Sequence, residues 1–240
     1  MNISSSRVQA IYHKELREYR RKRSIVVAMA IYPLLFMIQP MITIFTLSAS
    51  SAGQIANHHE LLYLLAIPAL VPATLAAYAV AGERQQGTLE PVLSTPLRRE
   101  EFLLGKALAV LAPSVVISYA VFGIFAACVE LLAQPGVAPA LLAGPDVLAQ
   151  LIFTPLLAGW SIWLGIAIST RVTEIRVAQQ IGLLANLPSI AVTTLVAVNL
   201  IHPTLALFIG GALLLLVLNR IGWRVASALF DRERLILGTR

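Results

Sequence analysis

Residues 177–219 read VAQQIGLLANLPSIAVTTLVAVNLIHPTLALFIGGALLLLVLN, a run of 43 residues without one charged side chain. A helix that crosses a bilayer uses roughly 20 apolar residues. The run is therefore too long for one crossing and has the length for two. Asn199 is a plausible end for the first helix and Pro203 suits the first turn of the second, so we expect the break there.

Shorter charge-free runs precede this one and complete a set of six predicted spans. The composition agrees, since 58% of the 240 residues are hydrophobic and only 12% are charged, against roughly 25% charged in soluble domains. The sequence predicts an all-α integral membrane protein and excludes a soluble enzyme, a disordered chain and a coiled coil. The predicted spans cover residues 24–48, 61–82, 107–129, 147–170, 177–198 and 203–219.

Every basic residue falls on one side of this arrangement. The 18 Lys and Arg residues lie before the first span, between the second and third, between the fourth and fifth, and after the sixth. The charged residues of the other loops are all acidic: Glu60, Glu130 and Asp146. By the positive-inside rule both termini are predicted to be cytoplasmic. The net charge of +6 is then a topology signal, and no nucleic-acid partner is expected because no basic-aromatic binding motif is present.

The segment 1–23 before the first span is predicted to form an amphipathic helix at the membrane surface. A basic amphipathic helix next to a span normally lies in the plane of the interface with the lipid bilayer. The alternative is a solvated helix that only carries the topogenic charges of residues 20–23. The apolar side chains that recur at helical spacing are Val8, Ile11, Tyr12, Leu16 and Tyr19.

The loops on the acidic side are short and offer little chemistry. His58, His59 and Glu60 are of metal-ligand types, but adjacent residues on a short loop make a poor metal site without partners. Asp146 follows Gly144-Pro145 and is expected to cap the fourth span. No Ser/His/Asp set or carboxylate pair suggests catalysis within the spans.

The longest basic-side loop, residues 83–106, has a specific pattern. Residues 82–97 read GERQQGTLEPVLSTPL, and Leu104-Gly105-Lys106 follows. Gly87 can end the preceding helix and Thr88 can cap a short new one. Thr95-Pro96 then breaks the chain before the third span.

The pattern GERxxGTLExxLxTP followed by LGK resembles the first cytoplasmic loop of type-2 exporter permeases of the ATP-binding-cassette (ABC) transporter family. Ser169-Thr170-Arg171 with Ala178-Gln179-Gln180 resembles the turn between the fourth and fifth spans of that family. The resemblance implies that the loop helix docks on a cytoplasmic ATPase and transmits its closure to the spans. A plain solvated hairpin is the alternative. Carried over by position, the resemblance assigns coupling to the ATPase to these residues: Glu83, Arg84, Gly87, Thr88, Leu89 and Glu90.

The chain is not expected to hydrolyse ATP itself. A phosphate-binding loop needs Gly-x-x-x-x-Gly-Lys-Ser/Thr, whereas Gly105-Lys106 has Glu100 five positions earlier and Ala107 directly after. We expect no cofactor on this chain; the resemblance implies that ATP and Mg²⁺ bind a separate ABC ATPase subunit. It also implies two ATPase copies and a second permease chain, identical or closely related.

The fifth predicted span carries polar or small side chains on one helical face. They step by three, four, three and four residues. Polar groups within a membrane normally face protein or water, so this face is either a wall of the translocation path or a helix-packing surface. The two readings stay open, and in a dimer they can coincide. The residues are Gln179, Gly182, Asn186, Ser189 and Thr193.

The predicted function is the permease subunit of an ATP-driven exporter in a bacterial inner membrane, with a small, amphiphilic or lipid-like substrate. One alternative is an ATPase-coupled membrane unit for complex assembly or mechanotransmission, as in cytochrome maturation. Another is a secondary transporter. That class is typified by internal repeats and intramembrane ionisable residues, and the predicted spans show no clear repeat and no charge at mid-span.

Overall fold

The computed structural model describes residues 4–46, 59–87, 98–133 and 137–230, and all regular structure within these ranges is helical. In chain order the elements are α1 (Ser5–Arg21), α2 (Arg23–Thr46), the 3₁₀-helix η2 (Glu60–Leu65), α4 (Ala66–Ala76), α5 (Ala81–Gln85), α7 (Arg99–Leu132), α8 (Val137–Leu141), α9 (Gly144–Arg171), α10 (Ile175–Ala197) and α11 (Leu205–Leu229).

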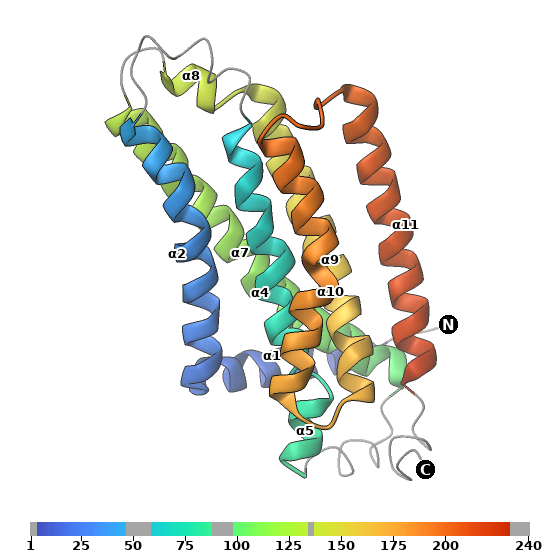
Figure 1. The fold of residues 1–240 in the computed structure, drawn as a ribbon. Helices are drawn as coiled ribbons and strands as arrows, with labels where there is room; N and C mark the ends of the chain where they lie inside the picture. Colours follow the sequence, from blue (N-terminus) through green and yellow to red (C-terminus); the bar gives the residue numbers. More distant parts are fainter. Residues whose placement is uncertain (1–3, 47–58, 88–97, 134–136, 231–240) are drawn as a thin grey trace.

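Six helical segments are long and apolar enough to cross a membrane, so the predicted all-α fold with six spans is confirmed. They rise side by side in a bundle (Figure 1). The spans are Ile25–Ile42, Leu61–Gln85, Arg99–Leu132, Gly144–Arg171, Ile175–Ala197 and Leu205–Leu229.

The 43-residue uncharged run forms two helices, α10 and α11, as predicted. Asn199 lies just past the end of α10 with a left-handed φ of 58°, a conformation that asparagine tolerates better than most residues. The Thr204 side chain accepts a hydrogen bond from the Leu207 amide at 3.2 Å and caps α11. Pro203 therefore precedes the cap rather than lying in the first turn, and α11 continues to Leu229, well past the predicted end at residue 219.

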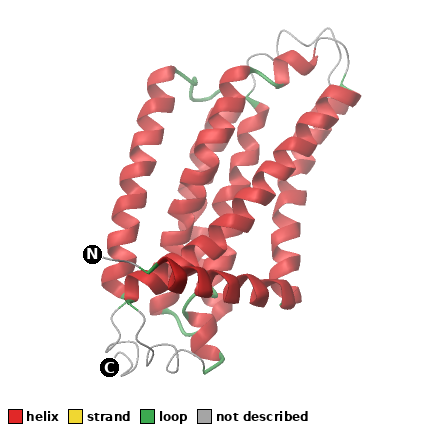
Figure 2. Cartoon of the chain, turned by 180° about the vertical axis from the view of Figure 1, so that it is seen from behind, coloured by secondary structure: helices red, strands yellow, loops and turns green. Residues whose placement is uncertain are grey.

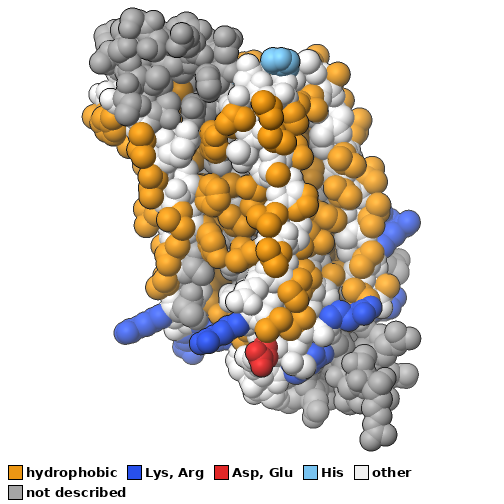
Figure 3. All heavy atoms as spheres, in the orientation of Figure 1, with side chains coloured by type: hydrophobic (Ala, Val, Ile, Leu, Met, Phe, Trp, Pro, Cys, Tyr) orange, Lys and Arg blue, Asp and Glu red, His pale blue; other side chains and the backbone are white. Residues whose placement is uncertain are grey.

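The described chain begins and ends at the same end of the bundle (Figure 1). Figure 2 shows α1 lying across this end, crosswise to the spans. On the face in Figure 3, Lys and Arg gather near this end while hydrophobic side chains cover the middle of the molecule. We call it the basic end and define it by α1, α5, the first two turns of α7 and the turn between α9 and α10. Placement of α1 in a lipid interface stays a prediction.

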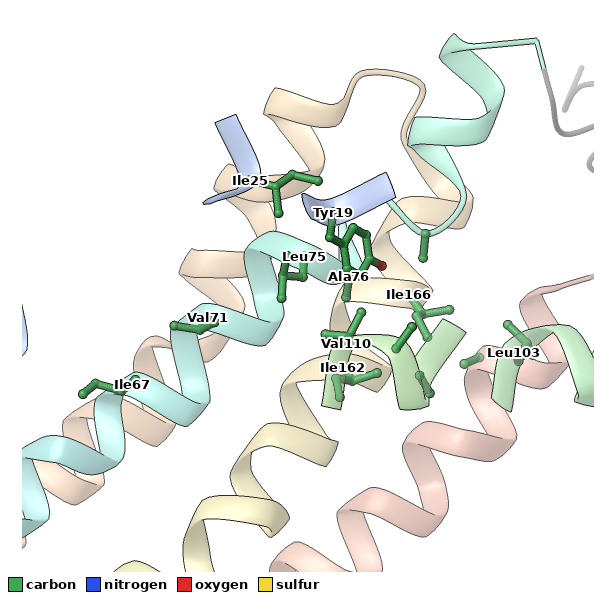
Figure 4. Packing of buried hydrophobic residues seen from close by; sticks show 14 of the residues in the cluster. Tyr19, Ile25, Ile67, Val71, Leu75, Ala76, Leu103, Val110, Ile162 and Ile166 are labelled. Atoms are coloured by element: carbon green, nitrogen blue, oxygen red, sulfur yellow. The ribbon is translucent and has the colours of Figure 1, made fainter. Parts of the chain in front are cut away.

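The bundle is organised around α4, which is buried along its whole length. It contacts α2, α7, α9 and α10. In Figure 4, Leu75 and Ala76 of α4 lie in one cluster with Val110 of α7 and Ile166 of α9. The outer faces of the other spans instead expose large apolar side chains, among them Leu34 at 65%. This distribution suits a bundle surrounded by lipid rather than water.

The second span, predicted over residues 61–82, is an irregular helical segment. It consists of η2, α4, a turn at residues 77–80, and α5. Pro68 and Pro72 each remove a backbone donor from this stretch, and such losses break or bend the regular hydrogen-bond pattern of a helix.

The third span also differs from its prediction, because α7 begins at Arg99 rather than at residue 107. The last part of the predicted loop 83–106 is therefore helical. The Glu101 carboxylate accepts hydrogen bonds from the backbone amides of Ser4 at 2.9 Å and Arg98 at 3.1 Å. The bond from Arg98 satisfies a backbone donor at the start of α7 that would otherwise be unpaired. The bond from Ser4 ties the start of α7 to the start of α1.

At the opposite end of the bundle, His59 Nδ1 lies 2.8 and 2.9 Å from the two carboxylate oxygens of Asp146. This contact joins the start of the second span to the start of the fourth. The predicted cap was wrong, since the N-cap of α9 is Ala143 and Asp146 lies buried within the first turn. In the described ranges no three His, Cys, Asp or Glu side chains are placed to hold a metal ion.

Candidate functional site at the basic end

Helix α1 packs closely on the start of α7. Its buried side chains are Ile11, Glu15 and Tyr19, spaced one turn apart on a single face. At Gly105 the two helices meet so closely that a Cβ there would lie 2.7 Å from Ile11 Cβ and Cγ2. Only glycine permits this approach without a shift of one helix, so Gly105 sets the position of α1 against the bundle.

A cluster of four charged side chains lies next to this contact. The Lys106 ammonium is 2.9 Å from Glu15 Oε1 and 3.0 Å from Glu83 Oε1. Lys14 Nζ lies 3.1 Å from the same Glu83 oxygen and 3.7 Å from Glu15. We call Lys14, Glu15, Glu83 and Lys106 the ionic cluster. It connects α1, α5 and α7, three segments that are far apart in the sequence.

The ionic cluster is largely removed from solvent. The Lys106 side chain is 1% exposed, Glu15 4% and Glu83 6%, while Lys14 at 44% reaches the surface. A buried charge is tolerated when it is paired and hydrogen-bonded. The two ammonium and two carboxylate groups of the cluster pair with each other and so meet this condition.

Lys14 of the ionic cluster has a raised pKa. Burial alone lowers the pKa of the Lys14 ammonium, but the carboxylates of Glu83, Glu15 and Glu18 outweigh this effect and raise the pKa above its usual 10.5. A raised pKa on a cation means that its pairing contributes fully below pH 10.5 and is lost only as the pH rises through the folded-state value. We therefore expect Lys14 to keep its charge at physiological pH.

The two charged residues of α5 point to different neighbours. Glu83 faces inward to Lys14 and Lys106, as described above. Arg84 instead reaches the end of α9, where its guanidinium lies 3.5 Å from the carbonyl oxygens of Thr170 and Val172. Cations near a helix C-terminus favour its free carbonyl groups. This short helix is thus held from both sides.

The remaining residues predicted for coupling follow α5. Gly87 has a φ of +67° and ends the described part of this segment, in the left-handed conformation that favours glycine past a helix end. The prediction that Gly87 ends the preceding helix is confirmed. Thr88, Leu89 and Glu90 lie outside the described residues.

The structure brings together the two stretches that resemble ABC permeases. Ala77 and Ala81 from the end of the second span form a buried cluster with Ala178 of α10. Gln179 Nε2 lies 3.4 Å from the Thr74 carbonyl oxygen of α4. Together with the contacts of Arg84 to Thr170 and Val172, these interactions place the start of the first loop beside the turn between the fourth and fifth spans, about 90 residues away in the sequence.

The predicted polar face of the fifth span lies partly against α4. Gly182 and Asn186 are buried, and a Cβ on Gly182 would be 3.7 Å from the Ala73 carbonyl oxygen. Asn186 donates to the Gly182 carbonyl oxygen at 2.8 Å, while its Oδ1 has no partner among the described residues. Gln179, Ser189 and Thr193 are half-buried, and Thr193 donates to Ile190 of its own helix. Their role in a path stays a prediction.

Sequence reasoning missed three members of the ionic cluster, Lys14, Glu15 and Lys106. Lys106 entered the predictions as a topogenic charge and as the end of the LGK pattern, with no ion-pair partner. One signal was present in α1, because Glu15 lies midway between Ile11 and Tyr19 on the apolar stripe. A carboxylate at such a position must find a cation when the stripe is buried.

The comparison with known protein families agrees with this architecture. The model of the ABC-2 family transporter protein matches residues 9–219, which covers most of α1, all six spans except the end of the last, and the rest of the basic end. No curated protein matches the sequence. The match spans well over half of the chain, so the protein belongs to the ABC-2 transporter family and is a multi-pass membrane permease of an ABC transporter.

Proposed function

We propose that this permease is driven by a separate cytoplasmic ABC ATPase that docks on the segment following α5. The observation that carries the proposal is the two-sided attachment of α5, through Glu83 to α1 and α7 and through Arg84 to the end of α9. A movement applied just past Gly87 would act on both attachments together. The movement would therefore be transmitted to the third and the fourth span together.

Within this proposal the coupling residues divide into two groups. Glu83 and Arg84 are positioning residues, since their side chains are engaged within the chain itself. Thr88, Leu89 and Glu90 would contact the ATPase, with the apolar Leu89 packing in its groove and the Glu90 carboxylate fixing the register. ATP and Mg²⁺ would bind the ATPase alone.

The basic end would face the cytoplasm of a bacterium, with the chain in the inner membrane and both termini cytoplasmic. The support is the distribution of charge, because the described Lys and Arg side chains gather at the end where α1 and α5 lie. Basic segments next to spans are retained on the cytoplasmic side. An ATPase in the cytoplasm would then meet α5 directly.

The working assembly would contain two permease chains, identical or closely related, and two ATPase subunits. ATP binding would draw the two ATPase subunits together and change the access of the path from the inner to the outer side. The substrate would be small, amphiphilic or lipid-like, because the candidate path residues are uncharged: Gln179, Gly182, Asn186, Ser189 and Thr193.

The test is reconstitution of the permease with its ATPase in liposomes, followed by measurement of ATP hydrolysis. Glu90→Lys reverses one charge in the segment proposed to dock. We expect it to abolish the stimulation of ATP hydrolysis by the permease while leaving the melting temperature unchanged. Glu130→Lys reverses the charge of an exposed residue near the other end of α7. This variant is the matched control and should still stimulate ATP hydrolysis. Full stimulation with Glu90→Lys would refute the docking assignment.

A further inference from the structure

An apolar groove of about 510 Å³ opens on the side of the bundle just above α1. Its walls come from α2 and α7, including Ala30, Pro33 and Ile117, and its floor is the side of α1 that carries Leu16 and Arg20. This volume falls within the roughly 300–1,000 Å³ typical of small-molecule sites. Figure 2 shows the arrangement of these helices, with α1 running beneath the rising spans.

The surface that lines the groove is apolar. Arg20 is its one charged lining residue, and every other lining residue is hydrophobic. Arg20 is exposed and, among the described residues, forms no ion pair. An occupant that matches the groove therefore has an apolar body and a negative group at the level of α1.

We propose that the groove binds an anionic phospholipid of the leaflet at the basic end, with its phosphate at Arg20 and an acyl chain along α2 and α7. Basic residues beside a span attract anionic lipids, and Arg20 lies three residues before the start of α2. An apolar helix of a second chain fits less well, since it would cover the Arg20 guanidinium without supplying a counter-charge.

The bound lipid would fill the space between α1 and the first span. Tyr19 lines the groove and lies on the buried face of α1 that also carries Glu15 of the ionic cluster. Occupation of the groove would therefore stabilise the docked position of α1. The inference needs only the placement of α1 at a membrane surface and is independent of the ATPase.

The experiment is native mass spectrometry of the full chain, delipidated in neutral detergent and titrated with dioleoyl phosphatidylglycerol or dioleoyl phosphatidylcholine. We expect one phosphatidylglycerol per chain, bound more tightly than phosphatidylcholine. Arg20→Gln should weaken phosphatidylglycerol roughly fivefold, the effect of about one cationic contact, and remove the preference. Arg21→Gln is the matched control, because Arg21 lies on another face of α1, beside His13 and Glu18.

A second variant tests the acyl-chain half of the site. Ala30→Trp fills the groove and should reduce binding of both lipids, whereas Ala206→Trp on the exposed face of α11 should not. Equal affinity of the wild type for the two lipids, or equal losses with Arg20→Gln and Arg21→Gln, would overturn the proposal. So would an Ala30→Trp protein that keeps its lipid but changes its oligomeric mass, since a second chain would then be the occupant.

Discussion

The Lys106 ammonium lies 3.0 Å from the Glu83 carboxylate, so an ion pair joins α5, at the end of the second span, to the first part of α7. Both groups are nearly inaccessible to solvent, and both also contact α1 through Glu15 or Lys14. The two side chains are thus held together, although 22 residues separate them in the sequence.

Removal of the central cation should destabilise the protein strongly. In Lys106→Met, the Glu15 and Glu83 carboxylates lose their nearest buried partner, and breaking a buried ion pair costs about 3–5 kcal/mol. Unfolding in detergent, followed by circular dichroism, measures the loss. Lys22→Met is the control, because Lys22 pairs with a partly exposed Glu18 at 3.4 Å and such pairs contribute about 0–1 kcal/mol. Equal losses in the two variants would contradict the ionic cluster.

Loss of the Arg84 side chain should loosen the turn between α9 and α10 without unfolding the protein. The contacts of Arg84 with the Thr170 and Val172 carbonyls are long, at 3.5 Å, so we expect Arg84→Ala to cost about 1 kcal/mol or less. Hydrogen–deuterium exchange should rise at residues 172–176. Gln85→Ala, which changes an exposed neighbour, should leave that exchange unaltered; the same rise in both variants would count against the anchoring role of Arg84.

A side chain at Gly105 should push α1 away from the bundle. Gly105→Val places a Cβ 2.7 Å from Ile11, and overpacking of this kind costs about 1–3 kcal/mol. Gly123→Val is the matched control, because no atom lies within 4 Å of a Cβ there. Ile11→Ala should restore part of the stability of Gly105→Val. If the second substitution restores nothing, the contact between α1 and α7 is misplaced.

Asn186 offers a test of the translocation path. Its Oδ1 is buried with no partner among the described residues, and its amide donates only within its own helix. Because an unsatisfied buried group costs free energy, Asn186→Ala should leave the stability unchanged or slightly higher. A path role predicts altered basal ATPase activity or cargo preference of the reconstituted transporter at this unchanged stability. Lower stability with unaltered transport would favour the packing role.

The number and order of the spans could be predicted from the sequence because lipid imposes a simple rule. Each crossing needs about 20 apolar residues, and charged residues must lie outside. The same rule required two crossings in the 43-residue run, and the helix-end signals at Asn199 and Pro203 placed the break between them. Helix boundaries were less accurate, as at Arg99, because the hydrogen bonds of Glu101 that begin α7 involve the distant Ser4.

The candidate site was predicted only in part. Glu83, Arg84 and Gly87 were selected through the family resemblance, and the structure places them together at the basic end. Their different directions could not be deduced from the sequence, since α5 is only five residues long and its neighbours come from other parts of the chain. The partners Glu15 and Lys106 lie 68 and 23 residues away from Glu83 in the sequence.

The scarcity of charge and its confinement to one side are properties of the sequence by itself. They determined that the protein crosses the membrane six times and which end is basic, because the transfer free energy of each side chain depends mainly on its own chemistry. Only the tertiary structure decided that four charged side chains form one cluster, three of them buried. Pairing depends on distances of a few ångströms between helices, and the close approach of α1 to α7 at Gly105 sets those distances.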